Sequence, residues 1–244
     1  LFVDSPNDFL TAYFNAQVWD STYSLSADTL FYFSKIDSGS ANGNAILKQD
    51  NQTISGQKIE YKEFPDSKGV SYAARGSVMI LEQERLATGG EAVYDRKNGK
   101  TTLRINPEIT DNGQVITGSE IFLKYKEDVL QDIFIPKDAR AIRPTNGTRE
   151  WFEVVDGDTS TFTDSTSFVD DMTGSTLRGF FVDGSLDSLR LEGMATTIYH
   201  LFEDSVYQGR NLVSGDTISM KFGNQDLDHI FVNGGSRGTY TPDS

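Results

Sequence analysis

The sequence predicts an all-β protein, and three observations support this prediction. Apolar and polar residues alternate in short runs such as 78–81, 133–135 and 217–222, which are rich in β-branched and aromatic residues. Helical periodicity is scarce, and the one short helical candidate spans residues 66–69. Pairs that favour hairpin turns separate many of the runs: Asn42-Gly43, Asn98-Gly99, Asn112-Gly113, Asp183-Gly184 and Asn233-Gly234.

The runs also repeat along the chain. A unit of the form apolar-x-Gly-x-x-apolar has Gly56, Gly89 and Gly118 as its markers, and Ala27 in a variant copy. The steps from residue 27 to 56, 89 and 118 are 29, 33 and 29 residues, so the period is near thirty. Gly215 marks a further copy 97 residues beyond Gly118, which corresponds to about three more periods.

Each period supplies about two strands, with a glycine that bends or bulges each one. A unit of this size cannot bury its apolar face alone and must stack on its neighbours. We therefore predict an elongated, repeat-built antiparallel sheet that folds over a continuous apolar interior, as one unit or as two stacked sub-domains. Edge strands at its two ends would remain free to pair with other strands.

The composition excludes several classes of function. Lys and Arg number 22 against 36 Asp and Glu in 244 residues, a net charge of −14, so we predict no nucleic-acid partner. No run of about 18 apolar residues is present, and no transmembrane segment is predicted. The absence of cysteine excludes disulfides and thiolate metal sites. The chain begins at Leu1, which suggests a processed product whose export signal has been removed.

Acidic residues concentrate in the C-terminal part. Residues 1–149 carry 17 basic and 20 acidic side chains, a net of −3, whereas residues 150–244 carry 5 and 16, a net of −11. The change follows residues 140–147, which contain Pro, Asn and Gly and are typical of a turn or linker. We therefore predict two segments, 1–149 and 150–244.

A short-polar stretch at 156–167 opens the acidic segment and predicts a long loop or an exposed edge strand. Asp156 and Asp158 stand two residues apart, as oxygen ligands do in calcium loops, but the closing Glu is absent. Solvation explains the stretch better than a divalent-cation site, and no metal site is predicted.

Three segments resemble the OstA-like family, which includes periplasmic lipopolysaccharide-transport proteins of the LptA type and the soluble part of the LptD type. They are 87–95 (Ala-Thr-Gly-Gly-Glu-Ala-Val-Tyr-Asp), 102–107 and 116–121. The middle segment departs from the family pattern, with Ile105-Asn106-Pro107 in place of Leu-x-Gly. Residues 189–199, with 209–211 and 216–222, look like the longer OstA-like proteins of Bacteroidetes-type bacteria.

This resemblance implies a folded-over β-jelly-roll, or β-taco, that needs no cofactor. Residues 1–149 would form OstA-like repeats, and residues 150–244 a second, acidic OstA-like segment. The resemblance further implies a non-enzymatic periplasmic protein that shields the acyl chains of lipopolysaccharide, or of a related lipid, in an apolar trough. Such proteins stack head to tail, through open sheet edges, into a bridge between the two membranes.

Strand alternation selects the residues that would line this trough. For any single one of them an ordinary packed core position is the favoured interpretation, and only a cavity between the sheets would make it a ligand surface. The candidates are Ile59, Tyr61, Val78, Ile80, Ala92, Tyr94, Leu103, Ile105, Ile121, Leu123, Ile133, Ile135, Leu189, Leu191, Ile218 and Met220, continued by Ile230 and Val232.

Charge favours the first segment for passing an anionic lipid, because exposed like charges repel within a Debye length of about 8 Å. The cations of that segment include Lys48, Lys58, Lys62, Arg75, Arg96 and Lys97.

Catalysis is not predicted. The two histidines, His200 and His229, lack companions at metal-ligand spacing, and no nucleophile-elbow or phosphate-loop motif occurs. The acidic pairs Asp170-Asp171 and Glu203-Asp204 could serve as acid and base on a glycan, but 36 acidic residues produce such pairs by chance. The main alternative to lipid transport is an acidic structural or adhesive β-repeat module that binds protein or glycan on its outer face. A glycan-processing β-helix enzyme is a third reading.

Overall fold

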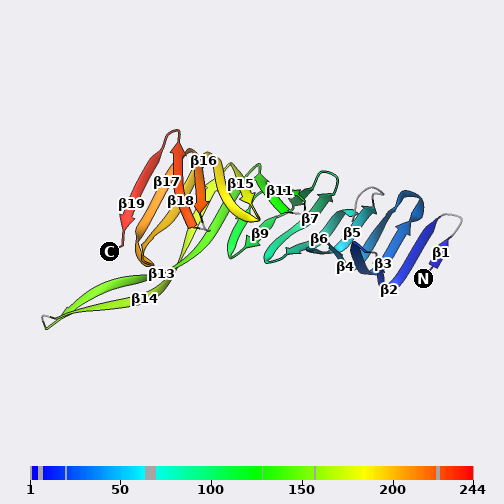
Figure 1. Cartoon of the computed structure of the whole chain (residues 1–244), viewed down its shortest axis with the longest axis horizontal. Coiled ribbons are helices and arrows are strands. Elements are labelled where there is room, and N and C mark those ends of the chain that lie inside the picture. Colours follow the sequence, from blue (N-terminus) through cyan, green and yellow to red (C-terminus); the bar gives the residue numbers. More distant parts are fainter. Residues whose placement is uncertain are drawn as a thin grey trace.

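The computed structural model describes residues 2–4, 8–19, 21–63, 70–127, 129–156, 158–223 and 226–243. These residues form one continuous sheet of nineteen strands in an elongated molecule, with the two termini toward opposite ends of its long axis (Figure 1). The predicted all-β class is therefore confirmed. The short helical candidate at 66–69 lies outside the described residues.

The strands and the one 3-10 turn of the described chain have the following bounds. They are β1 (Phe2–Asp4), β2 (Phe9–Trp19), β3 (Tyr23–Phe33), η2 (Ser34–Ile36), β4 (Ser38–Gln49), β5 (Gln52–Glu63), β6 (Val70–Glu82), β7 (Arg85–Asp95), β8 (Lys100–Arg104), β9 (Glu108–Asp111), β10 (Gln114–Thr117), β11 (Glu120–Lys126), β12 (Val129–Ile135), β13 (Ala139–Val155), β14 (Asp158–Gly174), β15 (Thr176–Val182), β16 (Ser185–Glu203), β17 (Val206–Gly223), β18 (Asp226–Asn233) and β19 (Arg237–Pro242).

The sheet folds over because most long strands change register near their middle. In β4, for example, residues 38–42 pair with one part of β5 and residues 45–49 with another, and Gly43 and Asn44 stand opposite a single residue. Two residues against one is a β-bulge, which bends the strand and increases its twist. We call these bends corners; they divide the sheet into two antiparallel faces.

Both faces run unbroken along the molecule through the strand pairings. Face 1 consists of 9–13, 29–33, 38–42, 58–63, 70–75, 91–95, β8, β11, β12, β15, 185–192, 217–223 and β18. Face 2 consists of 16–19, 23–26, 45–49, 52–55, 78–82, 85–89, β9, β10, β13, β14, 195–203, 206–214 and β19. One long side of the molecule carries the corners, and the other, the turn side, carries the hairpin turns of both faces.

The repeat markers Ala27, Gly56 and Gly89 lie at corners, and Gly43 lies at the corner of β4, between the first two. Gly43 has φ of +76° and Asn44 of +46°, a left-handed conformation that glycine and asparagine tolerate best. Asn44 Nδ2 donates to Asp28 Oδ2 at 3.1 Å on the neighbouring strand, and a Cβ on Gly43 would lie 2.3 Å from that oxygen. Glycine is therefore required here by both backbone angle and space.

Two predictions about glycine positions are wrong in detail. Asn42-Gly43 and Asn233-Gly234 lie at corners rather than in hairpin turns, because both features need the same left-handed backbone. The predicted number of repeats is the second error. The repeat unit marks every second corner, and three periods between Gly118 and Gly215 would place two such corners between them. In the described chain only one, at Gly174, lies there. The remaining length of this interval is taken up by the long hairpin of β13 and β14.

The predicted linker at 140–147 is also wrong, because these residues lie in β13. They pair without interruption with β14, from Arg140 opposite Thr173 to Gly147 opposite Thr166. The predicted segment boundary, between residues 149 and 150, falls inside the same strand. For residues 156–167 two structures are predicted, a long loop or an exposed strand, and the exposed strand is present from Asp158 onward. The hairpin of β13 and β14 projects from the body of the sheet (Figure 1).

The core is a single apolar cluster that extends from Ala16 to Met220 and takes residues from both faces. Its side chains come from alternate positions of each strand half, so the interior lies between the faces. Among the described residues, no helix combines the length and hydropathy needed to cross a membrane.

Candidate functional site

The predicted trough residues lie in the interior with one exception. Fifteen of the sixteen candidates are buried members of the core cluster: Ile59, Tyr61, Val78, Ile80, Ala92, Tyr94, Leu103, Ile121, Leu123, Ile133, Ile135, Leu189, Leu191, Ile218 and Met220. Ile230 and Val232 pack against this cluster while partly exposed. Their contact with a lipid stays a prediction.

Ile105 is the exception, since 64% of it is exposed. Alternation from Leu103 assumed a straight strand, but β8 ends at Arg104 and Ile105 lies at a corner with φ of +63°. Its side chain points outward over Gly90, where a Cβ would come within 2.7 Å of the Ile105 Cβ. At this corner the glycine stands on the opposite strand, and Ile105-Asn106-Pro107 takes the place of the usual Leu-x-Gly.

Polar contacts connect the two faces along the turn side of the N-terminal half. The Gln49 side chain of face 2 pairs with the backbone of Val70 on face 1, accepting at 2.9 Å and donating at 3.2 Å. The Tyr23 hydroxyl donates to Glu63, and Arg96 pairs with Asp50. We call these three pairs, together with Tyr125 and Glu82, the cross-face contacts.

The last cross-face contact joins a largely buried carboxylate, that of Glu82, to the buried side chain of Tyr125. The Tyr125 hydroxyl donates to Glu82 Oε2 at 3.1 Å. Burial raises the pKa of Glu82 above its ordinary value, an effect that the positive charge of Arg85 partly opposes. Burial also raises the pKa of Tyr125 well above 10.

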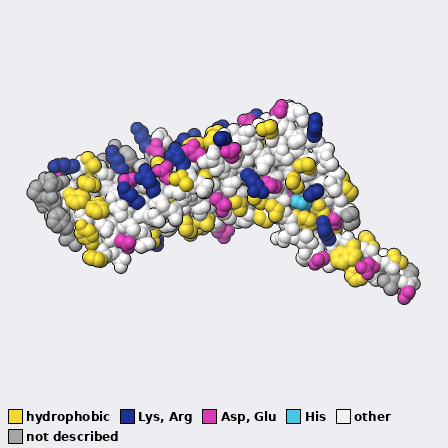
Figure 2. All heavy atoms as spheres, turned by 180° about the vertical axis from the view of Figure 1, so that it is seen from behind, with side chains coloured by type: hydrophobic (Ala, Val, Ile, Leu, Met, Phe, Trp, Pro, Cys, Tyr) yellow, Lys and Arg dark blue, Asp and Glu magenta, His cyan; other side chains and the backbone are white. Residues whose placement is uncertain are grey.

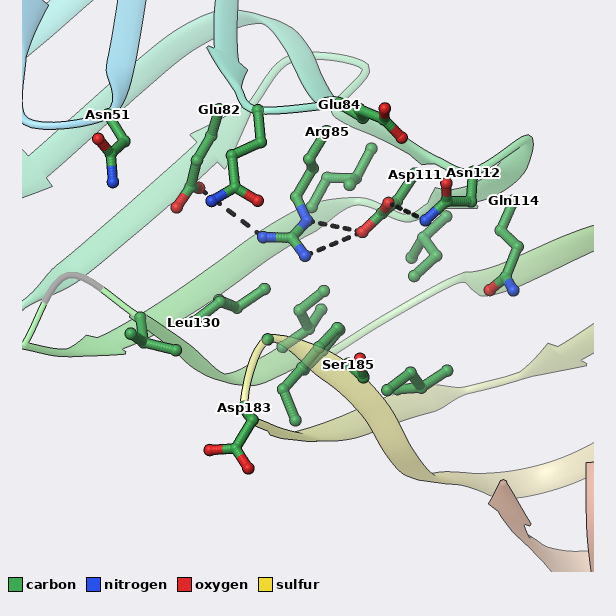
Figure 3. Close-up of a pocket in the computed structure, with 18 of the residues that line it drawn as sticks. Asn51, Glu82, Glu84, Arg85, Asp111, Asn112, Gln114, Leu130, Asp183 and Ser185 are labelled. Atoms are coloured by element: carbon green, nitrogen blue, oxygen red, sulfur yellow. Dashed lines mark hydrogen bonds and ion pairs between the residues drawn. The ribbon is translucent and has the colours of Figure 1, made fainter. Parts of the chain in front are cut away.

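Immediately beyond this contact the turn side opens into a pocket of about 600 Å³. Figure 3 shows the opening between the turn that carries Glu82 and Arg85 on one side and the turn that carries Asp183 and Ser185 on the other. The first turn belongs to face 2 and the second to face 1. The volume lies within the range of about 300–1,000 Å³ that is typical of ligand pockets.

The pocket has an apolar floor that is continuous with the core. Ile109, Leu130 and Ile133 line it and are themselves buried members of the core cluster. Ile116 and Leu186, which pack against that cluster, line it as well. A hydrocarbon chain on this floor would therefore be in contact with the interior of the sheet.

Charged side chains form the rim. Arg85 donates from Nε to Asp111 Oδ2 at 3.0 Å, and its Nη1 lies 3.7 Å from Glu82 Oε2 (Figure 3). Its guanidinium also lies 5.5 Å from the ring centroid of Phe181 on face 1. Arg85 thus contacts both walls of the opening.

Sequence reasoning missed this pocket, apart from Ile133. The pocket forms where five short strands, β8 to β12, replace the long strands that precede them. The departure at 105–107 marked the start of that interval, but alternation alone carries no information about which turns lie opposite each other.

The cations of the first segment are largely paired. Lys58 and Arg75 contact Glu60, Arg75 and Arg104 contact Glu91, and Arg96 contacts Asp50. Figure 2 shows Lys and Arg side chains interspersed with Asp and Glu along the body. These cations therefore provide little uncompensated positive charge for an anionic headgroup.

A second polar cluster lies at the base of the β13–β14 hairpin. Asp170 is buried, accepts from Arg143 Nη2 at 2.8 Å, and lies 2.9 Å from Nδ1 of His200. Its neighbour Asp171 pairs with Arg140. The adjacent acids Asp170 and Asp171 are thus bound in separate ion pairs on opposite sides of the strand.

No group of three or more His, Asp or Glu side chains in the described part of the chain is arranged to hold a metal ion. Asp156 and Asp158 stand at the tip of the β13–β14 hairpin, where Asp158 is exposed.

Residues 24–129 match the family model described as "LptA/(LptD N-terminal domain) LPS transport protein". The resemblance to the OstA-like family is confirmed for this segment. Among solved structures, the chain is similar to LptH of Pseudomonas aeruginosa, the LptA homologous periplasmic component of a lipopolysaccharide transport device. The two are 15% identical, the match covers 44% of this chain and 79% of the other, and the TM-score is 0.40. No curated protein matches the chain.

Proposed function

We propose that this protein takes part in lipopolysaccharide transport by holding the acyl chains of the lipid between its two faces, without catalysing a reaction. The observation that carries the proposal is the single apolar interior, which extends along a folded sheet whose end strands have one edge without a partner strand among the described residues. Similarity of residues 24–129 to lipopolysaccharide-transport proteins supports it. We further propose a periplasmic location and head-to-tail pairing with related sheets.

The interior is packed, so acyl chains can enter only if the faces separate locally. Burial of hydrocarbon contributes about 0.8 kcal/mol per methylene, or on the order of 10 kcal/mol for a chain of about a dozen. Each cross-face hydrogen bond contributes about 0.5–1.5 kcal/mol. An acyl chain between the faces would also replace the apolar contacts that their separation removes.

Two buried hydroxyl groups support a ligand that carries some polar atoms. Tyr72 and Thr101 face the interior, and neither hydroxyl has a hydrogen-bond partner among the described residues. A buried polar group without a partner is costly and rare. Ester or amide oxygens near the start of an acyl chain would supply the missing partners.

Site-specific photo-crosslinking tests the proposal. A benzophenone amino acid replaces Tyr94, which is buried, or Phe231, which is exposed. We expect crosslinks to lipopolysaccharide from position 94 and few from position 231, with native mass spectrometry of the unmodified protein giving the stoichiometry. Equal crosslinking at both positions, or no lipid adduct in the mass spectrum, would contradict the proposal.

The β13–β14 hairpin favours a second candidate, an acidic module that binds another protein through its outer surface. Trp151, Phe152, Val154 and Phe162 are exposed on it, next to Glu150 and Glu153. Figure 2 shows this concentration of hydrophobic side chains near the tip. A protein that bound a partner through the hairpin and took up no lipid would fit this candidate instead.

A further inference from the structure

We propose that the pocket between the turns at 82–85 and 183–185 is a side entrance through which an acyl chain reaches the interior. The inference rests on the proposed function and deepens it, because it assigns the route of a lipid that would otherwise enter from the ends of the sheet.

The first argument is the position of the pocket. Cross-face contacts occur at Tyr23–Glu63, Gln49–Val70, Asp50–Arg96 and Glu82–Tyr125, in this order along the molecule. The pocket begins where this series ends, since Glu82 belongs both to the last contact and to the rim. A chain that entered elsewhere along the N-terminal half would have to break these contacts first.

The second argument is the match between the pocket and a hydrocarbon chain. The floor residues Ile109, Leu130 and Ile133 belong to the core cluster, so the pocket and the interior share side chains. A chain could move from one to the other without crossing a polar layer. The rim, by contrast, is polar, as expected where a headgroup remains in water.

The third argument is the contact that spans the opening. Arg85 is held on face 2 by Asp111 and reaches face 1 through the ring of Phe181. The contact between the faces here is thus a cation–π contact rather than a hydrogen bond. Rotation of the Phe181 side chain alone would widen the opening and leave the Arg85–Asp111 ion pair intact.

The rim charge sets the orientation of the lipid. Glu82, Glu84, Asp111 and Asp183 outnumber Arg85, so the rim is acidic. An anionic headgroup is repelled from it, and an acyl chain would therefore enter first while the headgroup stays outside.

Blocking the opening tests the inference. The double variant Glu84→Trp with Ser185→Trp places a large ring on each of the two turns that face each other in Figure 3. The matched control, Ser21→Trp with Lys97→Trp, places the same rings on exposed turns of the half that has cross-face contacts. Circular dichroism and thermal unfolding establish that all three proteins fold alike.

The readouts are the rate of uptake of fluorescently labelled lipopolysaccharide, by stopped flow, and the amount bound at saturation. We expect the blocking variant to load at least tenfold more slowly than the parent and the control, with the same amount bound at saturation. Binding by the parent at a rate that the block leaves unchanged would overturn the side entrance and leave the proposed function intact. No uptake by the parent would overturn both.

Discussion

The N-terminal and C-terminal parts of this sheet follow the same corner pattern but differ in how far their two faces extend. From β2 to β7 each strand has 11–13 residues, and the parts on either side of the corner are of similar length. The ends of the two faces therefore meet on the turn side, where the cross-face contacts form. The strands β13 and β14, of 17 residues each, belong wholly to face 2 and extend it well beyond face 1.

This difference explains both the pocket and the hairpin. Where face 2 outgrows face 1, its turns no longer lie opposite those of face 1, and the surplus length forms the β13–β14 hairpin with its exposed aromatic rings. The pocket opens between these two regions, where the imbalance is reversed: β9 and β10 of face 2 have four residues each, whereas β11, β12 and β15 of face 1 have seven. Equal strand halves close a folded sheet, and unequal halves leave it open at the side.

The largest expected effect is a loss of stability at Leu103, which lies in the interior, compared with Ile105, which lies at a corner two residues later. Leu103→Ala removes a fully buried side chain and should lower the free energy of unfolding by about 2–5 kcal/mol. Ile105→Ala removes an exposed side chain and should change it by no more than about 0.5 kcal/mol. Urea unfolding of both variants provides the check, and a large loss for Ile105→Ala would mean that this residue belongs to the interior.

A smaller effect is expected for the cross-face contact of Gln49. Gln49→Ala leaves the backbone N–H and C=O of Val70 without their side-chain partner in a buried position, which should cost about 1–3 kcal/mol. Gln52→Ala is the control, since its hydrogen bond to Glu82 is long, at 3.5 Å, and only partly buried. Hydrogen exchange at the Val70 amide should accelerate in the first variant and remain slow in the second.

Two glutamates should respond to pH with opposite signs. Burial raises the pKa of Glu82, so its ionisation costs stability that is lost as the pH rises from the ordinary carboxyl value to the raised one. Glu82→Gln should therefore raise the melting temperature at pH 7, and the gain should vanish as the pH falls below the ordinary carboxyl value of 4.5, where both states bind the proton.

Glu60 provides the contrast on the outer surface of face 1. Hydrogen bonds from Lys58 and Arg75 lower its pKa, so the ionised form adds stability that is lost as the pH falls through the lowered value. Because the ion pairs of Glu60 with Lys58 and Arg75 are exposed to solvent, Glu60→Gln should lower the melting temperature at pH 7 only slightly. The variant should have no effect in acid, where the carboxyl group is protonated. Shifts of the same sign for both variants would contradict the assigned environments.

The smallest effect on stability is expected for the hairpin. Replacement of residues 150–163 by Asn-Gly connects Arg149 to Asp164, its cross-strand partner. A two-stranded ribbon with exposed apolar side chains adds little to the core, so the melting temperature should change by no more than about 2 °C. A loss of cooperative unfolding would show instead that the hairpin supports the body of the sheet.

Lipid uptake by the same shortened protein sharpens the comparison. The hairpin shares no residue with the pocket, so uptake should be unchanged if the two faces hold the lipid. Loss of uptake with the fold preserved would place the lipid-binding surface on the hairpin.

The sequence by itself determined the class of the fold and most of its interior. Alternation selects inward-facing residues such as Ile59 and Leu191 because the side-chain period of a strand is two and is local. The markers at Ala27, Gly56 and Gly89 located corners because a bulge needs residues that accept its backbone angles or close contacts. These properties depend on a few neighbouring residues and can be predicted without the tertiary structure.

Only the tertiary structure decided which ends of the strands meet. Asn42-Gly43 and Asn112-Gly113 have the same local signal, yet the first lies at a corner and the second in a hairpin turn, because the length of the adjoining pairing decides between them. Arg85 and Phe181 are 96 residues apart in the sequence (181 − 85). They are in contact because the order of the strands places their turns opposite each other on the two faces. The pocket exists because the strands of the two faces differ in length. That difference depends on many residues along several strands, so no local sequence pattern predicts it.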